Sequence, residues 1–223
     1  ADFLLKEGLE PARFERAIRY AVAQARARSG LLRLARRDPL TGLHNRGGIE
    51  ERAESARARA ERGQRMMGLC LVDLDGFKSV NDGLGHAVGD QLLQLVGRRL
   101  VHAVRPYDTV GRLGGDEFVV VIEDIDSEGE AEQIAHRLAA AVQPPFELSV
   151  SLPPVSASVG LAIYPRCGDS AGALLEVADA AMYTAKRGGK GRAAVYAEPV
   201  DRDGALLRTP ADVQEAARSG ALD

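Results

Sequence analysis

The apolar positions of this chain follow two spacings that alternate along the sequence. Apolar residues three or four positions apart, in places among many charged residues, predict helices over 11–37, 46–62, 90–102, 128–142 and 171–186. Short runs rich in Val, Ile and Leu, bounded by Gly, Pro or acidic residues, predict strands over 66–74, 108–113, 119–122, 146–150, 155–163 and 193–196.

The pair Gly114-Gly115 lies between two of the predicted strands. Paired glycines accept the positive φ that a tight turn needs, so the strands on either side are expected to form a hairpin. A hairpin within an alternation of helices and strands favours a mixed or antiparallel sheet with helices packed on it. The predicted fold class is therefore α+β, and a purely parallel doubly wound sheet fits less well.

The two ends of the chain differ in character from its middle. The helix over 11–37 has an apolar stripe from Phe14 to Ala25 that gives way to a run rich in arginine. This pattern indicates a stalk or signalling helix rather than a core helix. The sequence after residue 198 is polar and poorly patterned. We therefore expect three parts, over residues 1–37, 38–197 and 198–223.

Composition excludes several functional classes. The formal net charge of −3 gives no general attraction to DNA or RNA, so a polymeric nucleic acid is not expected as a partner. No apolar run reaches the roughly 18 residues that a membrane span needs. The cysteines, Cys70 and Cys167, are too few and too far apart for a zinc site or a disulfide scaffold, which fits a cytoplasmic location.

Acidic residues stand at two places where predicted strands meet turns. Asp116 and Glu117 follow the glycine turn directly. Asp73 and Asp75 end the strand over 66–74, and their spacing of two puts them on one face. Carboxylates brought together from two segments form the hard-cation site that magnesium prefers. The alternative, that the acids cap a following helical turn, is less favoured because both acidic segments occur together.

The acidic segments belong to longer motifs that resemble the GGDEF family of diguanylate cyclases over residues 38–196. In chain order the motifs are Asp38–Arg46, Asp73–Asp82, Gly85–Asp90, Gly114–Phe118 and Ala185–Lys190. Their order and separation make the resemblance specific. It implies a palm-like sheet of the ferredoxin or nucleotidyl-cyclase type, flanked by helices. It also implies condensation of two GTP molecules into cyclic di-GMP with release of pyrophosphate.

The resemblance implies a set of metal ligands and a base. Asp73 and Asp116 match the family's metal carboxylates, and the backbone carbonyl of Leu74 matches a further ligand. The implied cofactor is Mg²⁺ or Mn²⁺, as a pair of cations in each active site, which suits attack of a hydroxyl on a phosphoryl group. Asp116 also takes the position of the proton acceptor for the 3′-hydroxyl, and Glu117 shares the base and metal roles with it.

The resemblance also implies phosphate contacts. Gly76, Phe77 and Lys78 match a substrate-binding turn, and the Lys78 ammonium can offset charge on the triphosphate. Lys186 and Lys190 match cations that reach the β- and γ-phosphates. The alternatives are an ordinary surface lysine at position 78 and an ordinary helix C-terminus at 186–190.

Asn81 and Asp90 match the family's guanine-recognition pair. Guanine presents N1–H and an amino group as neighbouring donors, which an aspartate accepts, whereas adenine leaves the acid without a donor at N1. Asp90 has the alternative role of capping the helix that follows it. Asn81 has the alternative role of a turn former.

Arg105 and Asp108 match the family's Arg-x-x-Asp inhibitory motif, a short distance before the hairpin glycines. The arginine can hold a phosphate or a guanine edge of cyclic di-GMP, and the aspartate can accept from guanine donors. The alternative is a local ion pair between these two side chains. Arg137 is expected to supply a second contact to the product.

The implied reaction requires assembly of two chains. One site holds one GTP, so a symmetric product made from two GTP molecules requires a two-fold homodimer. The helix over 11–37 is the expected lever for dimerisation. Residues 1–6 and 14–22 are similar to the last strand and helix of a response-regulator receiver domain of two-component signalling, so a missing receiver upstream is expected. A phosphodiesterase domain is a possible continuation after the tail.

Two other functions compete with an active cyclase. Arg105 and Asp108 motivate the first, a module that senses GTP or cyclic di-GMP without turnover. A palm-type cyclase acting on ATP is disfavoured by Asn81 and Asp90. The hairpin keeps both of its glycines and both of its acids, so the active enzyme is the favoured hypothesis.

Overall fold

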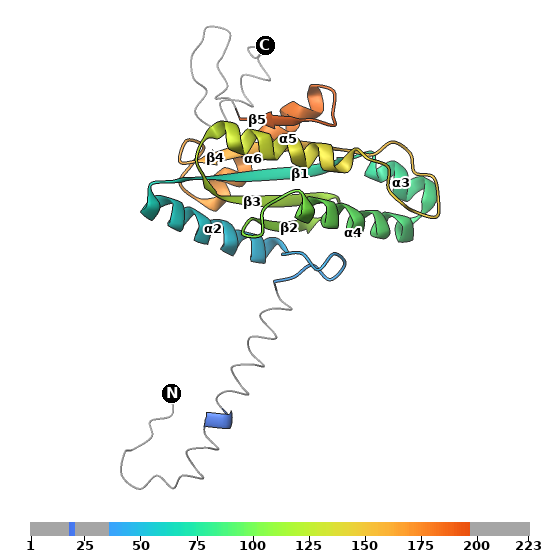
Figure 1. The fold of residues 1–223 in the computed structure, drawn as a ribbon. Coiled ribbons are helices and arrows are strands. Elements are labelled where there is room, and N and C mark those ends of the chain that lie inside the picture. The colour runs from blue at the N-terminus through green and yellow to red at the C-terminus, as the bar shows by residue number, and fades with distance from the viewer. Residues whose placement is uncertain (1–17, 21–35, 197–223) are drawn as a thin grey trace. The chain divides into compact units, whose positions relative to one another are not determined.

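The computed structural model describes residues 18–20 and 36–196 (Figure 1). The chain divides into one unit that ends at Arg37 and a second that begins at Asp38, and each is treated by itself. In the first unit, residues 18–20 are helical. The expectations for residues 1–6, for most of the helix over 11–37 and for the tail after 198 lie outside the described residues. The three-part division of the chain stays a prediction.

The second unit is built on a five-stranded sheet in the order β2-β3-β1-β4-β5. β1 pairs antiparallel with both β3 and β4, β2 pairs antiparallel with β3, and β5 is parallel to β4. The sheet is therefore mixed, as the α+β prediction requires. The strands are β1 (Met66–Asp75), β2 (Thr109–Gly114), β3 (Glu117–Ile125), β4 (Ser156–Tyr164) and β5 (Ala193–Val195).

Helices cover both faces of the sheet. α2 and α6 contact each other and pack on one face, while α4 and α5 pack on the other. α3 follows the end of β1 and packs against α4 (Figure 1). The helices are α2 (Arg46–Gly63), α3 (Phe77–Leu84), α4 (His86–His102), α5 (Glu128–Val142) and α6 (Ala171–Arg187).

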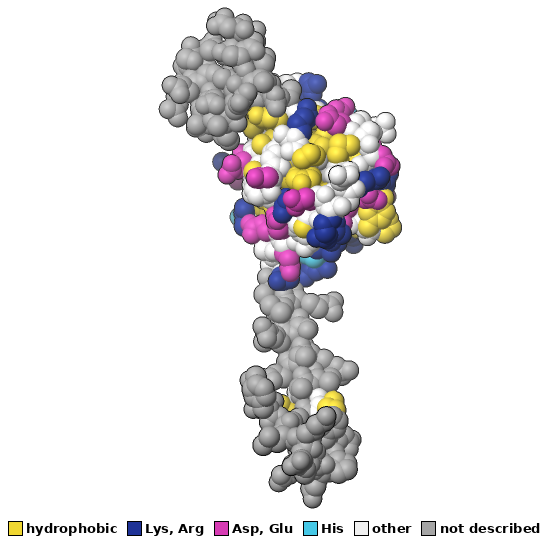
Figure 2. Space-filling view, turned by 90° about the vertical axis from the view of Figure 1, so that its left-hand side faces the viewer, with side chains coloured by type: hydrophobic (Ala, Val, Ile, Leu, Met, Phe, Trp, Pro, Cys, Tyr) yellow, Lys and Arg dark blue, Asp and Glu magenta, His cyan; other side chains and the backbone are white. Residues whose placement is uncertain are grey.

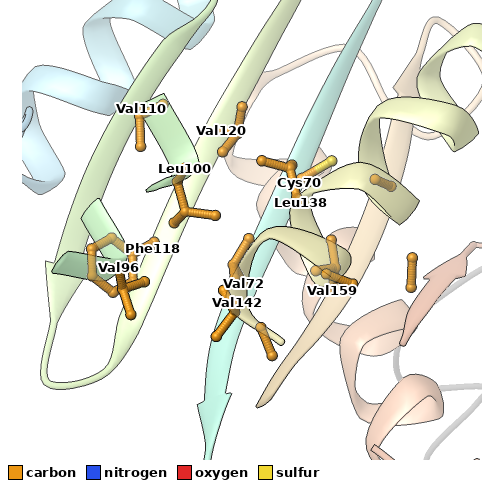
Figure 3. Close-up of a cluster of buried hydrophobic side chains, with 14 of the residues drawn as sticks. Cys70, Val72, Val96, Leu100, Val110, Phe118, Val120, Leu138, Val142 and Val159 are labelled. Atoms are coloured by element: carbon orange, nitrogen blue, oxygen red, sulfur yellow. The ribbon is translucent and has the colours of Figure 1, made fainter. Parts of the chain in front are cut away.

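The central strand β1 is apolar almost throughout because both of its faces are buried. Alternate residues point to opposite sides of a strand. Cys70, Val72 and Leu74 join the core beneath α4 and α5, and Met67 and Leu69 join the core beneath α2 and α6. Figure 3 shows the first of these cores, in which strand and helix side chains meet: Cys70, Val72, Val96, Leu100, Val110, Phe118, Val120, Leu138, Val142 and Val159.

The strand predicted over 146–150 does not form, and that prediction is wrong. Two guanidinium nitrogens of Arg99 donate to the carbonyls of Pro144 and Pro145, at 2.6 Å each, and the Arg99 guanidinium lies 3.8 Å from the Phe146 ring centroid. The chain here is held by a side chain from α4 instead of by a neighbouring strand. Consecutive prolines also remove the amide donors that a sheet ladder needs.

Two helical segments exceed the sequence prediction. α3 is not predicted, and α4 begins at His86 instead of Asp90. Residues 81–85 are mostly Asn, Asp and Gly, which favour turns, so the sequence does not indicate a helix here. The short helix α3 forms with Phe77 and Val80 buried. The other predicted helices and strands of the described unit are confirmed within a few residues at each end.

Two further features are the distribution of charged side chains on the surface and the hydropathy of the helices. On the face that Figure 2 shows, acidic and basic side chains are mixed with apolar ones. Among residues 18–20 and 36–196, none of the helices has the length and apolar character required to cross a lipid bilayer.

Candidate active site

The glycine turn between β2 and β3 carries the first acidic segment. Gly114 and Gly115 have φ of 148° and 51°, in the region that favours glycine, so the predicted hairpin is confirmed. The turn is tied down by Arg112, whose Nε and Nη2 donate to the Gly115 carbonyl at 3.0 and 2.7 Å. The same guanidinium donates to both oxygens of Asp38 at 3.1 and 3.2 Å. The hairpin tip is therefore fixed to the start of the domain.

Asp38 is itself held within its own turn. Thr41 donates to Asp38 Oδ1 from its amide at 2.8 Å and from its hydroxyl at 2.6 Å. Burial opposes ionisation of Asp38, but hydrogen bonds from Thr41 and Arg112 outweigh it and lower the pKa of this carboxyl. Asp38 thus stays charged and able to hold Arg112. Through Arg112, the sequence motif at 38–46 therefore helps to hold the hairpin that carries Asp116.

The acids from the two segments come together at the ends of β1 and β3. Asp73 lies opposite Glu117 in the β1–β3 register, and the Leu74 amide donates to the Asp116 carbonyl at 3.3 Å. Burial and then the nearby charge of Asp73 raise the pKa of both Asp116 and Glu117. Asp179, on α6, also contributes to the raised pKa of Glu117. The cluster is therefore a site of concentrated negative charge.

A cationic side chain lies on this cluster. Lys186 Nζ, from the last turn of α6, is 2.8 Å from Asp73 Oδ2, and its charge partly offsets the rise in the pKa of Asp116. The Lys186 ammonium therefore places positive charge next to the carboxylates, as a divalent cation bound there would. The donors are carboxylates and backbone carbonyls, which suit Mg²⁺ or Mn²⁺. Within the described residues, no group of three or more His, Cys, Asp or Glu side chains is already arranged as a metal site.

The expected phosphate-binding turn follows β1 directly. Gly76 precedes the first turn of α3, and Lys78 is exposed on that turn. The side chain of Phe77 packs in the core, so only its main chain remains for a nucleotide. The Leu74 side chain is likewise buried, which leaves its main chain at the site. Lys190 is exposed in the loop after α6, and its amide donates to the Ala185 carbonyl at 3.3 Å.

The two expected guanine contacts lie on neighbouring helices. Asn81 is on α3, and Asp90 is exposed within α4. Within residues 18–20 and 36–196, the Asn81 side-chain oxygen is buried without a hydrogen-bond partner, so it retains the capacity to accept from a donor. A Cβ on Gly89 would lie 2.0 Å from that oxygen, so the glycine beside Asp90 makes room for it. The N-cap alternative for Asp90 is wrong because α4 already begins at His86.

Arg105 and Asp108 form the expected inhibitory motif. Their side chains are held by other groups and not by an ion pair with each other. Asp108 Oδ2 accepts from the Arg105 amide at 2.9 Å, and Oδ1 accepts from the Glu123 amide at 3.1 Å. The Arg105 guanidinium pairs with Glu130 on α5, so the alternative of an ion pair between the Arg105 and Asp108 side chains is wrong. Burial, as the largest effect, raises the pKa of Asp108. Arg137 is exposed on α5, and its Nε donates to the Ala103 carbonyl at 2.6 Å.

Sequence reasoning missed several residues that shape these sites. Arg112 could have been identified from the sequence, because it lies two residues before the glycine turn. Asp75 is expected beside Asp73, but the sequence does not indicate its partners: its carboxylate accepts hydrogen bonds from β4 and from the loop after α6. Glu130 and Asp179 lie on helices far along the chain, and no local pattern connects them with Arg105 or Glu117.

Comparisons with known proteins agree with the fold. A sequence profile of the family described as "Diguanylate cyclase, GGDEF domain" matches residues 35–192. The chain is 43% identical over 170 residues to the bifunctional diguanylate cyclase/cyclic di-GMP phosphodiesterase MucR of Pseudomonas aeruginosa, covering 76% of this chain and 25% of MucR. It is 40% identical over 164 residues to the diguanylate cyclase TpbB of P. aeruginosa, covering 73% of this chain and 38% of TpbB. The chain thus spans only part of these relatives.

Solved structures show the same architecture. The crystal structure of the GGDEF domain of P. aeruginosa TpbB has a TM-score of 0.68 and 39% identity, covering 70% of this chain and 98% of that one. The coiled coil and GGDEF domain of DgcB from Caulobacter crescentus, solved in complex with c-di-GMP, has a TM-score of 0.72 and 27% identity, covering 82% of this chain and 97% of that one.

Proposed function

Since this chain belongs to the GGDEF family of diguanylate cyclase domains, we propose that it condenses two molecules of GTP into cyclic di-GMP and pyrophosphate. The observation that carries the proposal is the convergence of acids from β1 and β3 beside Lys186. Such a cluster has no evident role in packing, and it is suited to a substrate that brings phosphates and cations.

Asp73, Asp116 and the Leu74 carbonyl would hold a pair of Mg²⁺ or Mn²⁺ ions. When bound, these cations supply charge stabilisation to the phosphoryl oxygens and order the triphosphate. Lys186 is ion-paired with Asp73, so its ammonium lies beside a carboxylate that would be a metal ligand. From this place at the end of α6, Lys186 would contact the β- and γ-phosphates.

Asp116 and Glu117 are the candidate bases. Each of two condensations joins the 3′-oxygen of one GTP to the α-phosphorus of the other and releases one pyrophosphate, and the second condensation closes the ring. The proton of the 3′-hydroxyl must pass to a group near the attacking oxygen. Burial and neighbouring acids raise the pKa of both carboxyls, and a higher pKa makes a carboxylate a better proton acceptor. We assign the base role to Asp116, with Glu117 sharing the base and metal roles.

Guanine is held by Asn81 and Asp90 in this proposal. The Asp90 carboxylate accepts from both neighbouring guanine donors, and Asn81, whose buried oxygen has no hydrogen-bond partner among the described residues, complements the remaining edge. An adenine would leave an acceptor without a donor, which gives strong discrimination. Gly76, Phe77 and Lys78 bind phosphate oxygens from the start of α3, the Phe77 contribution coming from its main chain, and Lys190 adds a cation from the loop after α6.

The catalytic unit is proposed to be a homodimer with two sites facing each other. Each chain offers one set of acids and one guanine pair, while the product is a symmetric dinucleotide. The helix over residues 11–37 is proposed to bring the chains together, with a receiver domain upstream and a phosphodiesterase domain downstream as candidate neighbours. The cytoplasmic location stays a prediction.

Cyclic di-GMP is proposed to inhibit the enzyme by binding at Arg105, Asp108 and Arg137. All three lie on α5 or on the segment between α4 and β2. The Arg105 guanidinium is partly exposed beside Tyr107, at 5.8 Å from the ring centroid. An arginine in this position can contact a guanine edge or a phosphate in bidentate fashion.

A sensor that binds nucleotide without turnover is the second candidate, and the partly exposed Arg105 favours it. The full chain is therefore tested with GTP and Mg²⁺, with Asp116→Asn as the matched variant, and the product is identified by mass. The proposal expects cyclic di-GMP from the wild type and none from Asp116→Asn. ATP added as competitor should leave the rate unchanged. Binding of GTP by calorimetry without any product, even at high protein concentration, would favour the sensor instead.

A further inference from the structure

Asp75 is a buried acid for which the proposed mechanism has no direct use. It is the last residue of β1, and its exposed fraction is 8%. A buried carboxylate is costly unless it is hydrogen-bonded on both oxygens. The partners that satisfy Asp75 therefore show what this residue is for.

The carboxylate receives hydrogen bonds from two segments that are distant in sequence. Ser156 Oγ donates to Oδ2 at 2.9 Å, and Ser158 Oγ lies 3.1 Å from both carboxylate oxygens. Both serines are in β4, where Ser156 lies opposite Asp75 and Ser158 lies opposite Asp73. The Gly191 amide, in the loop between α6 and β5, donates to Oδ2 at 3.1 Å. Gly191 is further placed by its carbonyl, which accepts from Gln143 Nε2 at 3.3 Å.

These contacts put Asp75 between the two proposed phosphate-binding segments. Gly76 to Lys78 follow Asp75 directly, and Lys190 directly precedes Gly191. The hydrogen bond from Gly191 to Asp75 therefore fixes the distance between the main chain that carries Lys78 and the main chain that carries Lys190. The exposed Lys190 side chain has no partner of its own among the described contacts that would set its position.

We infer that Asp75 is a positioning residue that fastens the Lys190 loop to the end of β1 and so sets the spacing of the two lysines for a triphosphate. This inference rests on the proposed function. Asp75 itself contacts neither nucleotide nor metal, because its oxygens are already occupied by donors from β4 and the loop. Its role differs in this way from that of Asp73, which lies two residues earlier on the same face of β1 and faces Lys186.

The test measures affinity for an α,β-methylene analogue of GTP, which cannot release pyrophosphate, by calorimetry with Mg²⁺ present. Asp75→Ala removes the acceptor of the Gly191 amide, and a lost hydrogen bond to a charged group corresponds to about a tenfold weaker affinity. Asp75→Asn keeps one neutral acceptor oxygen and should restore most of the affinity. Ser158→Ala is the matched control, since it removes a donor from Asp75 without touching Gly191, and its affinity should equal that of the wild type.

Coupling to Lys190 separates positioning from general loss of structure. Lys190→Ala should weaken the analogue on its own, and Asp75→Ala combined with Lys190→Ala should be no weaker than Lys190→Ala alone, because a displaced loop has already lost that lysine. In turnover, Asp75→Ala should raise KM for GTP while kcat at saturating GTP changes much less. Additive losses in the double variant would overturn the inference.

A measurement on the wild type covers the case in which Asp75→Ala does not fold. The Gly191 amide should exchange its hydrogen slowly, and Asp75→Asn should make that exchange faster. Exchange at the rate of an exposed amide in the wild type would overturn the inference. Wild-type protein that does not bind the analogue would overturn the proposed function and this inference together, whereas wild-type affinity in Asp75→Ala would overturn the inference alone.

Discussion

At the scale of single residues, the candidate site is a cluster of like charges held close together. Burial and mutual repulsion raise the pKa of Asp116 and Glu117. An acid whose pKa is higher in the folded chain than in the unfolded chain destabilises the fold when it is ionised. The free energy lost in this way is fully present above the raised pKa, shrinks as the pH falls through it, and is gone below the acid's ordinary pKa, where both states are protonated.

Asp116→Asn should therefore abolish turnover without lowering the melting temperature at neutral pH. Removal of one charge relieves repulsion from Asp73, and a side chain at the tip of a hairpin supports no core packing. Melting is measured at pH 7 and again near pH 5 without divalent cations. Any gain in stability over the wild type should shrink at the lower pH. A large fall in the melting temperature at pH 7 would show instead that Asp116 holds the hairpin together.

Glu130 is the second residue with a specific expected effect. Its carboxylate pairs with Arg105 and also accepts from the Asp126 amide at 2.9 Å. If cyclic di-GMP binds at Arg105, this acid competes with it. Glu130→Gln keeps a neutral acceptor for the Asp126 amide but weakens the ion pair with Arg105. The concentration of cyclic di-GMP that gives half inhibition should therefore fall severalfold, which corresponds to about 1 kcal/mol or less in binding free energy.

Arg105→Ala is the matched variant for this comparison. It should relieve inhibition by cyclic di-GMP and leave initial rates unchanged, because it lies away from the acids of β1 and β3. Both variants are compared by initial rates at several concentrations of added cyclic di-GMP. Unchanged inhibition in Arg105→Ala would show that the motif only ties the α4–β2 connection to α5.

Residue patterns predicted some of this chemistry and not the rest. Asp73 and Asp116 are visible in the sequence because Asp73 lies near the end of an apolar strand and Asp116 directly follows the glycine turn. The roles of Asp75 and Glu130 are not visible. Asp75 depends on a hydrogen bond from Gly191, 116 positions away, and Glu130 depends on an ion pair with Arg105 in the connection between α4 and β2. The sequence-based roles of the metal, guanine and phosphate residues stay predictions.

At the scale of elements, the hairpin depends on a cross-link that is not part of it. Arg112 joins the Gly115 carbonyl to Asp38, and both charged side chains of the pair are largely buried, with exposed fractions of 11% and 14%. Removing one member of a buried pair leaves the other without its counter-charge. The position of Asp116 therefore depends on the turn at 38–42.

Arg112→Ala should lower stability by about 2 kcal/mol, from the loss of charged hydrogen bonds, and should lower kcat because the acid-bearing tip is no longer fixed. Denaturant unfolding and turnover are measured on the same preparation. Arg65→Ala is the control, because its ion pairs with Asp124 and Asp126 are exposed and such pairs contribute little. Equal effects of the two variants on turnover would contradict the role given to Arg112.

The same scale shows why two elements escape prediction. α3 is short, and its Asn, Asp and Gly residues favour turns, so the packing of Phe77 and Val80 decides its structure. The segment over 146–150 has β-forming residues, but Arg99 holds its preceding carbonyls and keeps it out of the sheet. Tertiary contacts overrule local propensity in both cases.

At the scale of the whole molecule, the sheet order follows from the hairpin and from antiparallel pairing on both sides of β1. The sequence predicts this mixed sheet because the glycine turn is recognisable. It does not predict which strand becomes central, although the apolar character of β1 on both faces is consistent with that place. Under the proposed function, a second copy of the chain is required for the reaction, so activity would be a property of the assembly.

The most direct measurement is the rate of cyclic di-GMP formation per chain, by mass spectrometry, over a wide range of protein concentrations with GTP and Mg²⁺. The account predicts that product forms, that the rate per chain rises with concentration as dimers assemble and then levels off, and that Asp73→Asn gives none. Calorimetric binding of GTP with no product at any concentration would contradict it.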